Sequence, residues 1–141
     1  MRTITLGSTG ITVPANAFGA LPVQRADTET AIKILRKAYQ GGMTFFDTAR
    51  AYSDSEYKLG LAFRELDRKT YYLATKTQAK DPAAFRQDLE ESLRLLGTDY
   101  VDIYQFHCAD TCFRPGDGTG MYEEMEKAKA EYENFRKQIG A

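Results

Sequence analysis

The sequence predicts an α/β fold with a parallel sheet, in which a β-hairpin precedes four βα units. β-prone segments alternate with helical segments of ten or more residues, which is typical of βαβ units. Each helical segment has apolar residues at spacings of three and four. Because βαβ crossovers are right-handed, these units form either an open doubly wound sheet or a segment of a (β/α)8 barrel.

The hairpin is expected over residues 1–14, where two β-prone segments flank the turn-rich stretch 7–10. The four βα units then occupy residues 15–141, and we expect the whole chain to form one domain. The first unit begins with a short strand over 15–20. Pro22 follows this strand and discourages further regular structure.

Helix ends are marked by residues that suit them. Asp27 and Asp81 precede helical segments and can accept hydrogen bonds from the free N–H groups of a first turn. Gly41, Gly97 and Gly140 stand where helical periodicity stops, and glycine tolerates the left-handed conformation of a helix end. The expected helices cover residues 28–40, 53–66, 82–96 and 122–139.

Composition excludes several classes of function. The chain has 141 residues, of which 43% are hydrophobic and 28% charged, and its formal net charge is −1. A nucleic-acid-binding domain would be strongly basic, and a membrane span would need about 18 consecutive apolar residues. The two cysteines and the lack of an export signal favour a reducing compartment. We therefore expect a cytoplasmic protein that binds neither nucleic acid nor membrane.

Three successive predicted strands end on a polar side chain. These residues are Asp47, Lys76 and His107, after the strands 43–46, 71–75 and 100–106. Taken singly, such an Asp is often a turn former, such a Lys is solvated, and a lone His is commonly structural. The carboxyl ends of parallel strands face one side of a molecule, where ligands bind. Three polar groups at these ends therefore favour a single site.

The stretches 46–56, 74–77 and 93–107 occur in an order and spacing that point to one family. The first contains Asp-Thr-Ala followed by a Tyr and then Ser-Glu, the second is Ala-Thr-Lys-Thr, and the third ends in Gln-Phe-His. Together with the opening residues 6–10, they resemble the aldo-keto reductase family over residues 1 to about 130. The resemblance implies a TIM (β/α)8 barrel. Such a barrel needs about 250 residues, so 141 residues supply only its N-terminal half.

The resemblance also implies four catalytic residues, Asp47, Tyr52, Lys76 and His107. Tyr52 would give a proton to the carbonyl oxygen of a substrate, although a phenol near pKa 10 is a reluctant acid. Lys76 would lower that pKa as a nearby cation, and Asp47 would hold the lysine in place. His107 would orient the carbonyl group by hydrogen bonding. The hydride must come from a nicotinamide cofactor, NADP or NAD, because no side chain supplies one.

Cofactor-binding residues implied by the resemblance are Gly19, Ala20, Leu21 and Asp47. Gly19 allows close approach of a ligand, although it is equally an ordinary turn glycine. The implied function is that of an NAD(P)-dependent oxidoreductase that reduces a small carbonyl substrate, an aldehyde or ketone. The alternative is a truncated, catalytically silent half-barrel that binds cofactor poorly.

Two further expectations concern metals and partners. Cys108 and Cys112 form a C-x3-C pair beside His107, but a metal site would need further ligands nearby, so we expect no metal. Half a barrel has two unpaired sheet edges and an uncovered inner face. We therefore expect a homo-oligomer, in which two copies of four strands pair or exchange elements.

Overall fold

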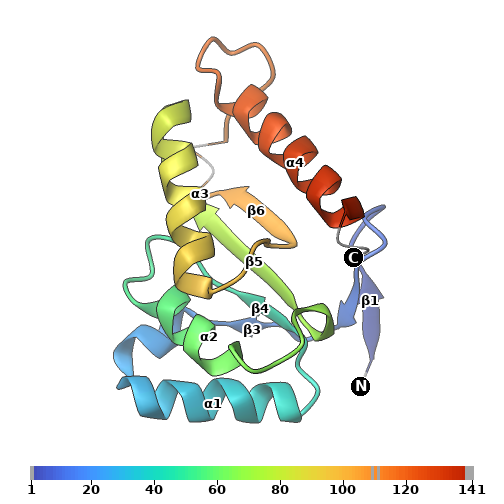
Figure 1. The fold of residues 1–141 in the computed structure, drawn as a ribbon, viewed down its shortest axis with the longest axis vertical. Coiled ribbons are helices and arrows are strands. Elements are labelled where there is room, and N and C mark those ends of the chain that lie inside the picture. Colours follow the sequence, from blue (N-terminus) through green and yellow to red (C-terminus); the bar gives the residue numbers. More distant parts are fainter. Residues whose placement is uncertain (1, 109, 111, 139–141) are drawn as a thin grey trace.

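The computed structural model of the protein describes residues 2–108, 110 and 112–138. A hairpin is followed by strands that alternate with helices (Figure 1). The strands are β1 (Thr3–Thr5), β2 (Thr12–Pro14), β3 (Phe18–Gly19), β4 (Phe45–Asp47), β5 (Tyr72–Thr77) and β6 (Ile103–Phe106). The helices are α1 (Thr28–Gln40), α2 (Ser55–Phe63), α3 (Pro82–Leu96) and α4 (Met121–Gln138), with the short 3-10 helices η1 (Leu21–Arg25) and η2 (Arg68–Thr70).

The main sheet has its strands in the order in which they occur along the chain. Its order is β3-β4-β5-β6, every pair is parallel, and β1 and β2 form a separate antiparallel pair. A doubly wound sheet reverses its strand order at a switch point, whereas a (β/α)8 barrel adds each strand beside the previous one. The observed order is that of the barrel, and the predicted half-barrel of four βα units after a hairpin is confirmed.

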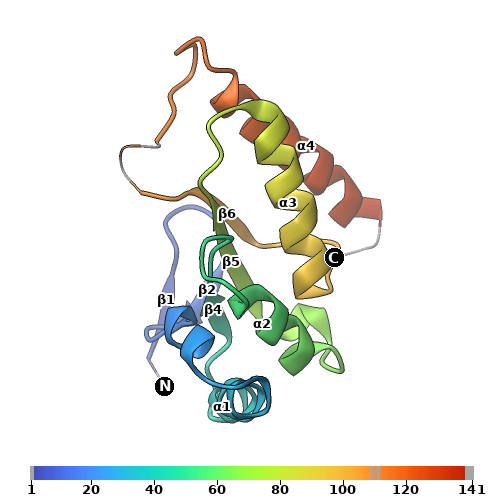
Figure 2. The same ribbon diagram turned by 90° about the vertical axis from the view of Figure 1, so that its left-hand side faces the viewer.

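Helices cover one face of the sheet, and Figure 2 shows α2 and α3 on one side of the strands with the hairpin on the other. The core lies between this helical layer and the strands. Phe46 of β4 and Leu73 of β5 are buried there against Leu35 of α1 and Leu59 of α2. Successive side chains of a strand point to opposite faces, so the residue that follows Phe46 in β4 points away from the helices.

The predicted ends of α1 and α3 agree with the structure, although Gly41, which follows α1, has φ of −76° and is not left-handed. The Asp27 carboxylate accepts a hydrogen bond from the Thr30 N–H at 2.9 Å, and Asp81 caps α3 in the same way through Ala84. Gly97 ends α3 with φ of 64°, in the left-handed region. The Gly140 prediction lies outside the described residues. In the part of the chain that the structure describes, no helix is both long and apolar enough to cross a membrane.

Three elements differ from the prediction, the first being α2, which spans Ser55–Phe63 where a helix over 53–66 was expected. Pro22 was expected to prevent regular structure, but it lies in the first turn of η1, where its fixed φ suits a helix and its missing N–H is not needed. β5 continues through Lys76 to Thr77 because its ladder with β6 extends that far, so Lys76 lies within the strand.

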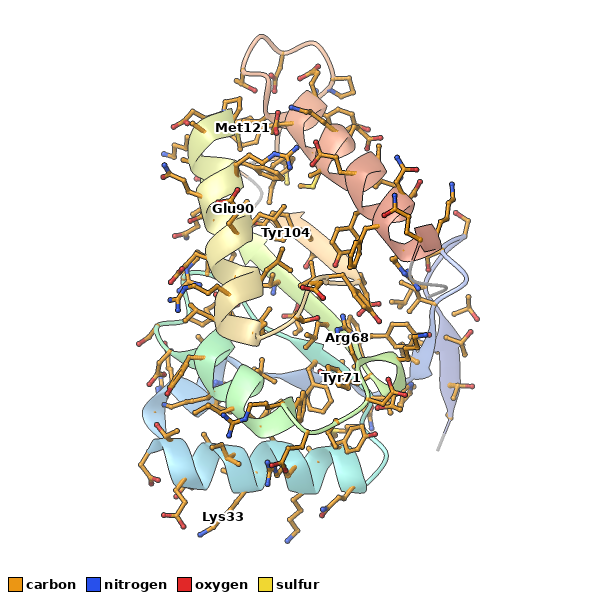
Figure 3. All side chains as sticks on the ribbon, in the orientation of Figure 1. Lys33, Arg68, Tyr71, Glu90, Tyr104 and Met121 are labelled. Carbon is orange, nitrogen blue, oxygen red and sulfur yellow. The ribbon has the colours of Figure 1, made fainter. Side chains whose placement is uncertain are left out.

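At the amino ends of β5 and β6, one cation joins the two strands. The Arg68 guanidinium donates to the carbonyl oxygens of Tyr71 and Tyr100 at 2.7 and 3.1 Å and to the Asp102 carboxylate at 2.7 Å. It also lies 3.9 Å from the centre of the Tyr100 ring. Figure 3 places Arg68 beside Tyr71, at the opposite end of β5 from Lys76. This end of the sheet is therefore held by a structural cluster.

Candidate active site

Asp47 and Lys76 form an ion pair at the carboxyl ends of β4 and β5. The Lys76 ammonium donates to the Asp47 carboxylate at 2.6 Å and to the backbone carbonyl of Thr48 at 2.7 Å. In the β4–β5 register Asp47 stands opposite Ala74, so Lys76 is two residues further along on the same face. The long lysine side chain reaches back across this offset, and its ammonium is held by two acceptors at once.

Tyr52 lies between this ion pair and His107. The Lys76 ammonium is 5.5 Å from the centre of the Tyr52 ring. On the other side, the His107 ring meets the Tyr52 ring edge to face, with centres 5.4 Å apart. The backbone N–H of His107 donates to the Thr77 carbonyl at 2.8 Å. This bond extends the β5–β6 ladder and fixes His107 at the strand end. The structure thus brings all four predicted catalytic side chains together.

The hydroxyl of Tyr52 is a weaker acid than a free phenol. Burial raises its pKa above the ordinary value of 10.0, and the Asp47 charge and the neighbouring Cys108 raise it further. These effects outweigh the Lys76 ammonium, which lies 5.5 Å from the centre of the Tyr52 ring, so the net direction of the pKa is upward. The expected lowering is therefore wrong for this arrangement.

The predicted cofactor residues lie on the neighbouring strand end. Gly19 pairs with Asp47 across β3 and β4, is exposed, and has open space where a Cβ would stand. Leu21 is 43% exposed, whereas Ala20 is fully buried and donates its N–H to the Asp47 carbonyl at 2.8 Å. Gly19 and Leu21 therefore present accessible surface at the strand end beside Asp47, while Ala20 between them is bonded to the Asp47 backbone.

A family comparison decides what these residues belong to. The model of the aldo/keto reductase family matches residues 6–134, which include β2 of the hairpin and all four site residues. The chain belongs to the aldo/keto reductase family. An L-galactose dehydrogenase of Arabidopsis thaliana is 37% identical over 122 residues, and the match covers 77% of this chain and 38% of that protein. The aldo-keto reductase YhdN of Bacillus subtilis (strain 168) is 38% identical over 107 residues, which are 67% of this chain and 32% of YhdN.

Solved structures of aldo-keto reductases show the same fold. The holo form of an aldo-keto reductase from Bacillus halodurans superposes with a TM-score of 0.78 at 29% identity, and the match covers 93% of this chain and 47% of that one. The chain therefore spans less than half the length of the curated relatives and of this structure. It corresponds to a partial barrel of the aldo-keto reductase fold.

Several residues that support the site were not predicted. The Thr48 carbonyl accepts from Lys76, and the Thr48 hydroxyl lies 2.9 Å from that of Ser55. The carboxylate of Glu56 is buried, accepts a hydrogen bond from the Thr75 hydroxyl at 2.6 Å and pairs with Arg50. The sequence signal for Thr48, Ser55 and Glu56 is that all three stand in the stretch 46–56, whose Asp-Thr-Ala and Ser-Glu carry the family resemblance.

Cys108 and Cys112 follow the site histidine as exposed thiols. Cys108 has φ of 75°, and its carbonyl oxygen lies 3.6 Å from the thiol of Cys112. Among the described residues, no three His, Cys, Asp or Glu side chains gather as a metal ion would require. That no metal binds remains a prediction.

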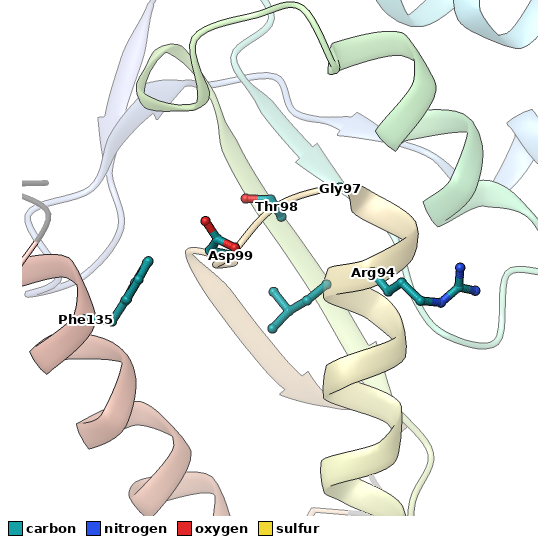
Figure 4. A pocket seen from close by; sticks show the side chains of 6 residues that line it. Arg94, Gly97, Thr98, Asp99 and Phe135 are labelled. Atoms are coloured by element: carbon teal, nitrogen blue, oxygen red, sulfur yellow. The ribbon is translucent and has the colours of Figure 1, made fainter.

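A large surface hollow lies away from this site. It measures about 590 Å³ and is formed by the end of α3 and by α4 (Figure 4). A smaller hollow of about 420 Å³ borders the loop that precedes Tyr52 and includes Arg50, Ala51 and Asp88. Parallel α/β folds bind ligands at the carboxyl ends of strands, and α3 ends at their amino ends. The larger hollow is therefore not the active site.

Proposed function

We propose that this chain carries the acid–base site of an NAD(P)H-dependent reductase that acts on a small aldehyde or ketone. The main support is the position of Tyr52, whose ring lies 5.5 Å from the Lys76 ammonium and 5.4 Å from the His107 ring. Relatives support the substrate class: a protein of Escherichia coli O157:H7 that is 35% identical over 89 residues is named methylglyoxal reductase.

Tyr52 is the proton donor in this proposal. Its raised pKa keeps the phenol protonated at neutral pH, which is the form that can give a proton to a carbonyl oxygen. When the proton leaves, the phenolate that remains is stabilised by the Lys76 ammonium. Asp47 keeps that ammonium in place, and His107 directs the carbonyl oxygen toward the phenol. A general acid of this kind contributes about 10²–10⁴-fold to a rate.

Gly19, Leu21 and Asp47 are the residues that would hold the nicotinamide end of the cofactor. When bound, the reduced nicotinamide supplies the hydride that the carbonyl carbon accepts. The exposed surface of Gly19 beside the Asp47–Lys76 pair would bring that end of the cofactor next to Tyr52. Both NADPH and NADH are candidates for this position.

Titration of the chain with NADPH and NADH, followed by protein and cofactor fluorescence, tests this proposal. We expect saturable binding of at least one cofactor and slow turnover of small aldehydes. Tyr52→Phe should keep cofactor binding and lose turnover by about 10²-fold or more, because only the proton donor is removed. Tyr57→Phe is the matched control, since Tyr57 is 46% exposed on α2. No binding at millimolar cofactor would contradict the proposal.

A second candidate function is a catalytically silent half-barrel that associates with itself. Within residues 2–108, 110 and 112–138, β3 and β6 each pair with one neighbour in the main sheet, so each leaves one edge open. Open edges of a sheet are sites for pairing with another chain. Light scattering of the purified chain tests this candidate. A clean monomer would exclude it, and a dimer without cofactor binding would favour it over the enzyme.

A further inference from the structure

Two polar side chains of α2, Ser55 and Lys58, bind the backbone of η1, and we call this pair the η1 clamp. The Ser55 hydroxyl donates to the Ala20 carbonyl at 3.0 Å. The Lys58 ammonium donates to the carbonyls of Val23 at 3.0 Å and Ala26 at 2.7 Å. Ser55 and Lys58 are three residues apart, and residues at this spacing share one face of a helix. One face of α2 therefore holds η1 at Val23 and at the two residues that flank it, Ala20 and Ala26.

Lys58 is a buried cation that the proposed reaction does not use. Its side chain is 2% exposed, and Asp54, which is 46% exposed, lies 2.8 Å from its ammonium. Burial of a charge is costly unless hydrogen bonds and an opposite charge satisfy it. Here two carbonyls and one carboxylate surround the ammonium. These directional contacts restrict where η1 can lie relative to α2.

The carbonyls that the clamp binds lie in a row. Ala20, Val23 and Ala26 are three residues apart, which is one turn of a 3-10 helix, so their carbonyl groups lie along one side of η1. Two of these oxygens also accept bonds within η1, from Val23 N–H to Ala20 at 3.3 Å and from Ala26 N–H to Val23 at 3.2 Å. The clamp thus reinforces η1 along one side, while Leu21 remains 43% exposed.

The clamp is also joined to the catalytic ion pair. The Ser55 hydroxyl lies 2.9 Å from the hydroxyl of Thr48, whose carbonyl accepts from the Lys76 ammonium at 2.7 Å. On the other side, the Ala20 N–H donates to the Asp47 carbonyl at 2.8 Å. Consequently hydrogen bonds through Thr48 and through the Asp47 backbone connect η1 and α2 to the Asp47–Lys76 pair.

We propose that Lys58 is a positioning residue for the cofactor, because it holds η1 so that Gly19 and Leu21 stand beside Asp47 before the cofactor arrives. The inference rests on the proposed function, which puts the nicotinamide end at this place. Lys58 acts through η1 and does not touch the reacting atoms. Its loss should therefore weaken cofactor binding and leave the proton transfer from Tyr52 nearly unchanged.

The first test is hydrogen exchange of η1 in the full chain without cofactor. Lys58→Met keeps an unbranched side chain of similar length and removes the ammonium. We expect the amides of Val23 and Ala26 to exchange about tenfold faster or more, because two charged hydrogen bonds are lost. Arg68→Met is the matched control, since Arg68 also binds backbone carbonyls but at the amino ends of β5 and β6. It should leave the exchange of η1 unchanged.

The second test is cofactor affinity and turnover. Lys58→Met should raise the Kd for NADPH roughly tenfold and change kcat by no more than about twofold. Lys58→Arg, which keeps the charge and its donors, should restore part of the affinity. Arg68→Met, compared with Lys58→Met under conditions in which the two variants have lost the same free energy of unfolding, should not weaken NADPH binding. This comparison separates positioning of η1 from a general loss of stability.

The outcomes distinguish the two proposals. The inference would be overturned if the η1 amides of Lys58→Met exchanged no faster than those of the unsubstituted chain. It would also be overturned if Arg68→Met weakened NADPH binding as much as Lys58→Met does. No NADPH binding by the unsubstituted chain would overturn the proposed function and the cofactor role of Lys58 together, while hydrogen exchange would still decide whether Lys58 holds η1. If Lys58→Met does not fold, Ser55→Ala replaces it, and unchanged exchange and affinity in that variant would equally refute the clamp.

Discussion

The Lys76 ammonium lies 2.6 Å from the Asp47 carboxylate, so its positive charge acts on Tyr52 together with a negative one. An ion pair exerts a weaker field at a distance than either of its charges alone. Burial and the Asp47 charge therefore outweigh the lysine, and the pKa of Tyr52 is raised. Tyr52 therefore rests as a protonated phenol, which suits a group that has to donate its proton.

Asp47→Asn should lower the pKa of Tyr52, because the Asp47 charge is one of the causes that raise it. Without that carboxylate, the phenolate forms more easily and the Lys76 charge is no longer balanced. In a carbonyl reduction that requires the protonated phenol, the loss of rate at alkaline pH should then begin at a lower pH. Spectrophotometric pH titration, with Tyr52→Phe subtracted to remove the other tyrosines, measures the shift. The exposed Asp99→Asn serves as control, and an unchanged or higher pKa in Asp47→Asn would contradict the prediction.

Gly60→Ala should destabilise the fold more than Gly97→Ala. A methyl group at Gly60 would collide with the carbonyl oxygen of Leu95 where α2 crosses α3, and backbone cannot move aside cheaply. The expected loss in the free energy of unfolding is about 2 kcal/mol or more. Gly97 has open space around it but φ of 64°, so alanine there should cost about 1 kcal/mol. Urea denaturation compares the two variants, and the reverse order would show that this helix contact is not tight.

Arg68→Met should lower the free energy of unfolding by about 3 kcal/mol, because it leaves the buried Asp102 carboxylate without its partner. Its counterpart Arg94→Met removes an ion pair to Glu91 whose side chains are 68% and 43% exposed. That change should cost no more than about 0.5 kcal/mol. Urea denaturation with circular dichroism measures both, and similar losses for the two variants would argue against a structural role of the Arg68 cluster.

Local features of the sequence were sufficient to predict much of this fold. Asp27, Asp81 and Gly97 determine helix ends through bonds to their own neighbours or through their own dihedral angles, so no distant partner is needed. The meeting of Asp47 with Lys76 was also predictable, because parallel strands place their carboxyl ends together whatever the details of packing.

The remaining features depend on partners far away in the sequence. Pro22 can either stop a helix or begin one, and η1 forms where Lys58, 35 residues from Val23, is available to bind its carbonyls. A buried lysine on α2 gives no sign in the sequence of which acceptors it will meet. The pKa direction of Tyr52 was mispredicted because its largest cause is burial, which depends on how distant segments pack around the ring.

Because neighbouring strands of the sheet are also consecutive in the sequence, residues that meet at the site can be exchanged between proteins as one contiguous stretch. Asp47, Tyr52, Lys76 and the Ser55 and Lys58 clamp all come from β4, β5 and the single crossover between them, within residues 45–77. A recombination event that transferred this one stretch between two barrels would carry the acid, its lysine and their support as a unit. The strands on either side would then be free to diverge around the proposed proton donor.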